Sequence, residues 1–222
     1  MTMVTAYTWQ DRVIIMADSR EHTRNNEGRM VEYNDEQEKI TPVKNLLAFA
    51  EAGLRKVYRG EGCYFDMNQV TDYFIEQNEA ILSKATGKQL LEGLVTMWNL
   101  TMSEKLGRNP FSINNRFSLL LAGFEVENGE RKPRIHTYQS HFQKFQYNGN
   151  KAVIGDDGCY PIMMPYFQRD TGDMTFDQTL EFYLRGYAEV MKQVETIGGP
   201  IDIYVLEGDP KCSYWIRRKV KE

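Results

Sequence analysis

The stretch VIIMADSR, residues 13–20, is apolar without interruption over its first five residues and then turns to charged and polar side chains. A continuous apolar run of this length, rich in β-branched residues, predicts a strand that is buried on both faces. The segment 3–7 before it is also β-rich, and the polar Gln10-Asp11 pair between the two predicts a turn. We therefore expect a hairpin whose second strand, 13–17, is buried on both sides.

The rest of the chain alternates between runs of strands and runs of helices. Residues 19–38 are polar and predict a long exposed loop or a frayed ribbon. Further strands are expected at 39–42, 45–50, 117–123, 133–138, 142–147, 152–155, 201–206 and 213–216. Helices are expected at 67–82 after an Asp66 cap, at 86–106, and from 173–175 to a stop at 198–200.

The order of these elements, ββ(ββ)αα(ββββ)αα(ββ), predicts an α+β fold in which two antiparallel sheets pack face to face between helix layers. This architecture is a four-layer αββα sandwich. No Pro/Ser-rich linker, low-complexity tract or internal repeat interrupts the chain. Residues 1–222 are therefore expected to form a single domain.

Composition excludes several classes of function. The 222 residues include 27 basic and 31 acidic side chains, a net charge of −4, with no block of five like charges. Nucleic-acid and anionic-membrane partners are therefore not expected. The longest apolar runs are of strand length and the N-terminus has no basic region before an apolar one, so neither secretion nor a membrane span is indicated. A cytoplasmic protein is expected.

Metal, cofactor and common hydrolase motifs are absent from the sequence. Cys63, Cys159 and Cys212 form no CxxC pair, which argues against a disulfide framework or a cysteine zinc site. His22, His136 and His141 lie in a polar loop and on expected strands with no metal-like spacing, which is typical of surface or sheet packing. No phosphate-binding, nucleophile-elbow or zinc-protease motif occurs. We expect no metal and no cofactor.

Thr2 is a candidate nucleophile because of its position behind Met1. Removal of the initiator methionine, which is usual before so small a residue, places a hydroxyl and an α-amine on one residue. An α-amine has a reference pKa of about 7.7–8.0, so part of it is free base at neutral pH and can take the hydroxyl proton through a water. The alternative is that Thr2 is an ordinary second residue, since threonine is common there.

Asp18 and Arg20 close the buried strand, where charged groups need partners. They form either a structural salt bridge or a support that orients a lysine beside the terminal threonine. Lys39 is the candidate lysine, because its charge lowers the pKa of a neighbouring hydroxyl and of an amine. Gly53 follows it by fourteen residues, and a glycine lets a backbone N–H approach an oxyanion. The alternative for each residue taken singly is structural: Lys39 is then a surface lysine, and Gly53 forms a turn between a strand and a helix.

Taken together, these residues resemble the proteasome-type N-terminal nucleophile (Ntn) hydrolases, which include proteasome β-subunits, the peptidase subunit of the bacterial two-component protease, and the ancestral β-subunit-like Anbu family. Members begin with a mature threonine, reach an Asp-Ser-Arg-like triplet sixteen residues later, and place a lysine fourteen residues before an Ala-Gly. In this chain Asp18 follows Thr2 by sixteen and Lys39 precedes Gly53 by fourteen. Segments 152–155, 173–175 and 198–202 are also family-like, and the family has an αββα sandwich.

The resemblance implies a role for each residue. Thr2 is the nucleophile and, through its amine, the base; Lys39 activates it; Asp18 orients the lysine. The N–H of Gly53 is the oxyanion donor, and Arg20 holds the site residues in place without contacting the substrate. The resemblance also implies a peptide or unfolded-protein substrate and a homo-oligomer, ring-shaped or helical, whose active sites face a shielded space. An ATPase partner is left open.

The sequence departs from proteasome β-subunits where they hold the terminal amine with a serine in a Gly-Ser-Gly-Ser-like turn and with Asp and Ser before the Gly-Gly. The matching turn here is 155–158, Gly-Asp-Asp-Gly, which is closer to Anbu-like sequences, and the other two positions are Val194 and Ile197. A working site therefore requires that Asp156, Glu195 or Thr196 replace these supports of the amine.

Glu51 precedes Gly53 by two residues and shares its face of the strand. The resemblance implies that this position lines the pocket for the residue before the cut bond, so a carboxylate predicts a preference for Arg or Lys. The alternative is that Glu51 pairs with Arg55 or Lys56.

Three functions remain open on sequence alone. The first is a threonine amide hydrolase, a peptidase that transfers the acyl group to Thr2. The second is a catalytically silent assembly subunit, and the third is a small-molecule amidase or a transpeptidase that uses the same nucleophile.

Overall fold

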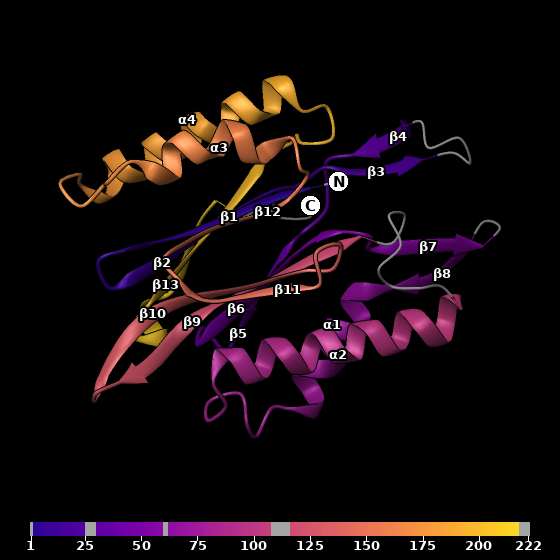
Figure 1. Cartoon of the computed structure of the whole chain (residues 1–222), viewed down its shortest axis with the longest axis horizontal. Coiled ribbons are helices and arrows are strands. Elements are labelled where there is room, and N and C mark those ends of the chain that lie inside the picture. Colours follow the sequence, from indigo (N-terminus) through magenta and orange to yellow (C-terminus); the bar gives the residue numbers. More distant parts are fainter. Residues whose placement is uncertain (1, 25–29, 60–61, 108–115, 218–222) are drawn as a thin grey trace.

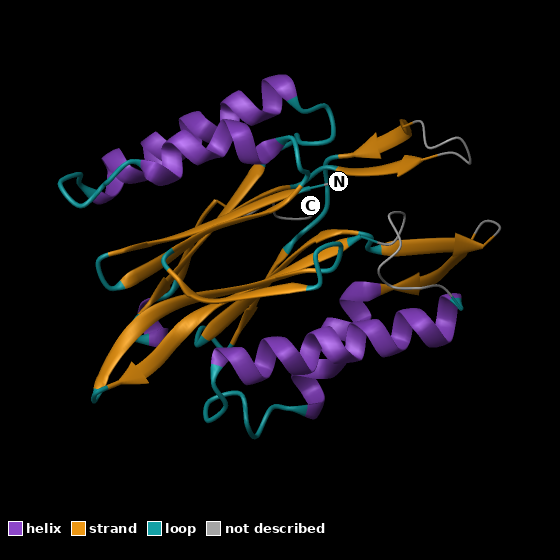
Figure 2. Cartoon of the chain, in the orientation of Figure 1, coloured by secondary structure: helices purple, strands orange, loops and turns teal. Residues whose placement is uncertain are grey.

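The computed structural model describes residues 2–24, 30–59, 62–107 and 116–217. Two five-stranded antiparallel sheets pack face to face, and each carries a pair of helices on its outer face, as predicted (Figures 1 and 2). The first sheet has the order β12 (Lys151–Gly155), β1 (Met3–Trp9), β2 (Arg12–Asp18), β13 (Ile201–Glu207) and β14 (Tyr214–Arg217). The second has the order β11 (Lys144–Gly149), β10 (Glu130–Gln139), β9 (Phe117–Glu127), β6 (Leu47–Gly53) and β5 (Ile40–Val43).

The helices form the two outer layers. α3 (Cys159–Gln168) and α4 (Phe176–Gln193) cover the first sheet, and α1 (Met67–Gln77) and α2 (Gly87–Leu106) cover the second (Figure 1). α1 begins at the predicted Asp66 cap, whose carboxylate accepts the N–H of Asn68. α2 and α4 begin with Thr86 and Thr175, each of which forms a reciprocal capping box with the glutamine three residues later.

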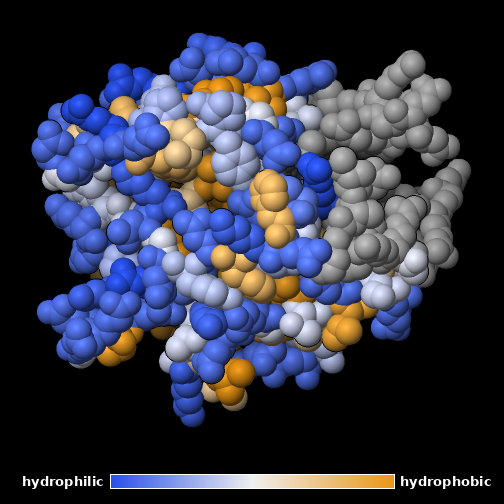
Figure 3. Space-filling view, in the orientation of Figure 1, coloured by the Kyte–Doolittle hydropathy of each residue, from blue (hydrophilic) through white to orange (hydrophobic). Residues whose placement is uncertain are grey.

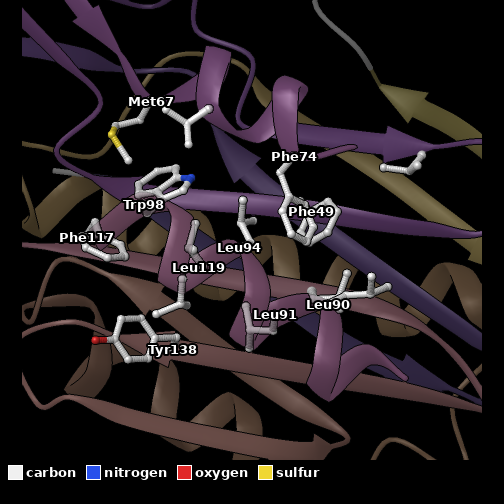
Figure 4. Close-up of a cluster of buried hydrophobic side chains, with 14 of the residues drawn as sticks. Phe49, Met67, Phe74, Leu90, Leu91, Leu94, Trp98, Phe117, Leu119 and Tyr138 are labelled. Carbon is white, nitrogen blue, oxygen red and sulfur yellow. The ribbon is translucent and has the colours of Figure 1, made fainter. Parts of the chain in front are cut away.

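β2 is buried on both faces, as its apolar run predicts. Ile14 and Met16 belong to the apolar cluster under α3 and α4, whereas Val13 and Ile15 belong to the cluster between the two sheets. A third cluster lies between the second sheet and α1 and α2, where Trp98 and Phe117 are in ring contact (Figure 4). The charged end of β2 is therefore surrounded by core on two sides.

Two short ribbons extend from one end of the sandwich (Figure 1). The first pairs β3 (Glu21–Arg24) with β4 (Met30–Asn34), so the ribbon alternative for residues 19–38 is confirmed. The second pairs β7 (Lys56–Arg59) with β8 (Gly62–Asp66). The sequence analysis placed no strand there, because charged residues and glycines interrupt the β-rich residues of this segment.

Two helix ends differ from the predictions, and one helix had no predicted range. α1 ends at Gln77 and not at 82, because Asn78 turns its side-chain amide back onto the carbonyl of Phe74, at 2.8 Å. α4 ends at Gln193, before the glycines expected to stop it. α3 had no predicted range of its own, since its two prolines, Pro161 and Pro165, obscure a helical pattern.

The surface view shows mainly hydrophilic side chains with small separate apolar groups (Figure 3). Among the described residues, no helix is both long and apolar enough to cross a membrane.

Candidate active site

Asp18 ends β2 as a fully buried carboxylate that accepts four hydrogen bonds. Its Oδ1 accepts the N–H of Met3 at 2.9 Å and the Nζ of Lys39 at 3.0 Å. Its Oδ2 accepts the N–H groups of Arg20 and Gly198, each at 3.2 Å. The carboxylate thus joins the start of β1, the residue before β5 and the loop before β13, which lie far apart in sequence.

Lys39 reaches this carboxylate from the residue before β5, and its side chain is only 4% exposed. Besides Asp18, its Nζ donates to the carbonyl of Arg20 at 2.6 Å. Burial lowers the pKa of Lys39, the charge and hydrogen bond of Asp18 oppose this, and the charge of Arg55 lowers it further. A buried lysine with a lowered pKa is suited to exchanging a proton with a neighbouring group.

Thr2 lies directly before β1 and is buried, with 6% of its surface exposed. Its carbonyl accepts the N–H of Asp156 at 3.0 Å, while the N–H of the next residue, Met3, binds the same Asp18 oxygen as Lys39. The peptide bond that follows Thr2 is therefore fixed through both its C=O and its N–H. One carboxylate oxygen of Asp18 thus holds both Lys39 and the peptide N–H that follows Thr2.

Tyr187 of α4 is a member of this cluster that the sequence analysis took for core packing. Its buried hydroxyl donates to the carbonyl of Met3 and accepts the N–H of Asp18 at 2.8 Å. Burial and the charge of Asp18 raise the pKa of Tyr187 well above its ordinary value. The hydroxyl therefore stays neutral and ties the start of β1 to the end of β2. Nothing in the sequence distinguishes it from the other core tyrosines of α4.

Asp156 follows Gly155 in the turn that holds Thr2. One carboxylate oxygen accepts the N–H of Gly158 at 3.0 Å, and the other accepts the hydroxyl of Thr196 at 2.7 Å. Two of the three residues proposed to take over the amine are thus hydrogen-bonded to each other, beside the carbonyl of Thr2. Val194 and Ile197, which flank Thr196, pack into the apolar cluster under α3 and α4.

Gly155 is the position that lets the turn approach Thr2. Its φ is +127°, and a Cβ there meets the carbonyl oxygen of Thr2 at 1.7 Å. We expect Gly155→Ala to lower the free energy of unfolding by at least about 2 kcal/mol, because backbone strain and a backbone clash combine. Gly129→Ala is the matched control: φ there is +83° and nothing lies within 4 Å, so strain alone remains, at about 1 kcal/mol. Urea denaturation of both variants measures the difference, and equal losses contradict the clash.

Arg20 holds the loop before β13 against the residues that follow β2. Its guanidinium makes two hydrogen bonds to Asp35, at 2.9 and 3.1 Å, and one to the carbonyl of Glu195 at 3.2 Å. It packs so closely on Gly198 that a Cβ there meets the Arg20 Cζ at 2.3 Å. Arg20 therefore fixes the loop that supplies the Gly198 N–H to Asp18, which is the supporting role implied by the resemblance.

Gly53 ends β6 on the second sheet with φ at +101°. A Cβ there meets the carbonyl oxygen of Arg116 at 2.3 Å, so only glycine fits. A small hollow lies between the two sheets at this point. Its lining includes residues from both sides of the site: Ala52, Gly53, Phe117, Ser118, His141 and Gly155, with Arg116 and Asp157 at the rim. The candidate oxyanion donor and the turn that binds Thr2 therefore face one hollow.

Glu51 lies opposite Lys39, to whose carbonyl its N–H donates at 3.2 Å. Its carboxylate lies 3.9 Å from the Nε of Arg55, which also lies 3.9 Å from Asp66. The alternative partner named from sequence, Arg55, is thus in place. Burial raises the pKa of Glu51 to about 7, since the charge of Arg55 offsets only part of the desolvation and Asp66 adds to it.

This shift predicts a pH dependence of stability. Because the pKa of Glu51 is raised by folding, from 4.5 to about 7, its contribution is complete below pH 4.5 and is lost as the pH rises through about 7. We expect Glu51→Gln to raise the Tm at pH 8 by at least about 3 °C relative to the natural chain. At pH 4.5 the two proteins are expected to melt together. Calorimetry at both values checks this, and a Glu51→Gln chain that melts lower at pH 8 contradicts it.

No group of three or more histidine, cysteine, aspartate or glutamate side chains with metal-binding geometry occurs among the described residues. Cys159 and Cys212 are free thiols, and Cys63 lies among the side chains for which no burial is described.

Comparison with known proteins agrees with the fold. No family model matches the chain, and no curated protein matches it. Among solved structures, it is similar to the Anbu (Gly-1) mutant from Hyphomicrobium sp. strain MC1, with a TM-score of 0.66 and 16% sequence identity. The match covers 96% of this chain and 85% of the other. The chain therefore has the proteasome-like fold that the sequence resemblance implies.

Proposed function

We propose that the chain is a threonine-type amide hydrolase, a peptidase that acts through Thr2 after removal of Met1. The observation that carries the proposal is the shared oxygen of Asp18, which binds both the Lys39 ammonium, at 3.0 Å, and the N–H next to Thr2, at 2.9 Å. After removal of Met1, a buried lysine held by the carboxylate that also binds the N–H after Thr2 supports acyl transfer to that threonine. The proteasome-like fold supports the same conclusion.

The proposed reaction has two halves. The free α-amine of Thr2 takes the hydroxyl proton through a water, and the oxygen attacks the substrate carbonyl, helped by the positive charge of Lys39. The N–H of Gly53 stabilises the oxyanion, and the proton passes to the departing amine as the C–N bond breaks. Water then adds to the ester and gives a proton to the α-amine, and this proton passes to the Thr2 oxygen as the ester C–O bond breaks. Asp156 and Thr196 are proposed to hold the amine.

The substrate is proposed to be a peptide or unfolded protein, and Glu51 to line the pocket for the residue before the cut bond. Because Arg55 partly neutralises this carboxylate, a basic preference depends on whether Arg55 moves aside. Fluorogenic peptides ending in Arg, Lys or Leu test the preference, and equal cleavage of all three contradicts it. We also propose that the chain is cytoplasmic and forms a homo-oligomer. Light scattering measures the mass of the oligomer.

The experiment that tests the function is an intact mass of the purified protein, before and after incubation with a peptide epoxyketone. This probe needs a hydroxyl and a free amine on the same residue. Loss of Met1 and addition of one inhibitor per chain support the nucleophile. A retained Met1 with no addition favours the second candidate, a catalytically silent assembly subunit. That candidate is supported by Val194 and Ile197, which are apolar where proteasome β-subunits have the polar residues that hold the amine.

A further inference from the structure

Arg116, directly before β9, contacts both halves of the candidate site. Its guanidinium Nη1 donates to Asp157 at 3.1 Å, and Asp157 belongs to the 155–158 turn that binds Thr2. Its carbonyl accepts the N–H of Leu54 at 2.8 Å, directly after Gly53. One residue therefore links the nucleophile on the first sheet to the oxyanion donor on the second.

The contacts at both ends of this link are tight. Gly53 lies so close to the carbonyl of Arg116, and Gly155 so close to the carbonyl of Thr2, that neither position has room for a Cβ. His141, whose side chain is 11% exposed, places its Nε2 3.6 Å from the other oxygen of Asp157. A displacement of the Asp157 side chain is therefore transmitted to the backbone on either side of the hollow.

Acyl transfer requires such a constraint, because the nucleophile and the oxyanion donor lie on separate sheets. A misplacement of about 1 Å between reacting groups costs about 10²-fold in rate. We propose that Arg116 and Asp157 are positioning residues whose ion pair acts as a clamp across the sheets, fixing the spacing between the Thr2 hydroxyl and the Gly53 N–H. This proposal rests on the proposed function.

The clamp is expected to affect rate more than stability. The side chains of Arg116 and Asp157 are 32% and 57% exposed, and pairs so exposed contribute about 1 kcal/mol or less to folding. We expect Arg116→Met and Asp157→Asn each to lower kcat at least about 10-fold, with KM changed less than about twofold. The double variant is expected to match the single ones, because both remove one interaction. Arg116→Lys is expected to recover part of the rate.

Arg134→Met is the matched control. It breaks the Arg134–Glu127 ion pair, 2.6 Å long, on the β9–β10 hairpin, and is expected to leave kcat unchanged. A clamp is ruled out if Arg116→Met leaves kcat unchanged, if the two losses multiply in the double variant, or if KM alone rises. The last result indicates substrate binding instead.

Hydrogen exchange separates this proposal from the proposed function. The N–H of Asp156 bonds to Thr2 and that of Leu54 to Arg116, so exchange in peptides spanning them reports on the two ends of the link. Faster exchange of the Asp156 N–H in Arg116→Met supports the clamp, whether or not the natural chain hydrolyses peptides. A natural chain that hydrolyses nothing contradicts only the proposed function. If the natural chain is active and Arg116→Met changes neither the exchange of the Asp156 N–H nor kcat, only the clamp is contradicted.

Discussion

Thr2→Ala is expected to lower kcat/KM for peptide hydrolysis by at least about 10³-fold, because it removes the attacking oxygen while leaving every backbone contact of the site in place. Removal of Met1 needs a small second residue, and alanine is smaller than threonine. The variant therefore still forms a free terminal amine. The Thr2 carbonyl still accepts the Asp156 N–H, and Met3 still binds Asp18. The loss therefore reports on the hydroxyl. Steady-state hydrolysis of a fluorogenic peptide measures it.

Two further variants make this result specific. Thr2→Ser keeps a hydroxyl on the terminal residue and is expected to remain active. Thr5→Ala is the matched control, since Thr5 is fully buried on the same strand and its hydroxyl has no hydrogen-bond partner among the described residues. It is expected to hydrolyse peptides at the natural rate. A Thr2→Ala chain that stays as active as Thr5→Ala means that Thr2 is not the nucleophile.

The architecture was accessible from the sequence because its main elements carry strong local signals. The unbroken apolar run of β2 predicts burial on both faces, and that requires a layer on each side, which the sheet and the helices supply. At Asp66 and Thr175 the cap side chain accepts a backbone N–H two or three residues later, so local contacts define each helix start. Signals of this kind need no knowledge of distant contacts.

The candidate site could be predicted from the sequence only in part. Spacing along the chain placed Thr2, Asp18 and Lys39 together, and the hydrogen bonds of Asp18 agree with it. Tyr187 was missed because its contact with Met3 spans 184 residues and its helix reads as ordinary core. The link through Arg116 was missed because the structure joins its carbonyl and its side chain to different sheets, which no local pattern records.

Asp18→Ala is expected to lower the free energy of unfolding by about 3–5 kcal/mol, the largest stability effect at the site. The substitution leaves the buried Lys39 ammonium without its carboxylate and removes the acceptor of the Met3 and Gly198 N–H groups. The Arg20 N–H keeps the carbonyl of Gly198 as its acceptor. Each buried donor left unpaired costs about 1–3 kcal/mol, and a buried unpaired charge costs more. Urea denaturation, followed by circular dichroism, measures the loss.

Lys39→Met separates this structural role from catalysis. It removes the ammonium but leaves Asp18 with the same three N–H donors, so the carboxylate keeps most of its hydrogen bonds and methionine fills the space. We expect a loss of stability clearly smaller than that of Asp18→Ala, together with a loss of hydrolysis close to that of Thr2→Ala. If Lys39→Met unfolds as readily as Asp18→Ala, the lysine is needed chiefly to neutralise the carboxylate. If it folds normally and stays active, Lys39 does not activate Thr2, because the charge that lowers the pKa of the hydroxyl is gone.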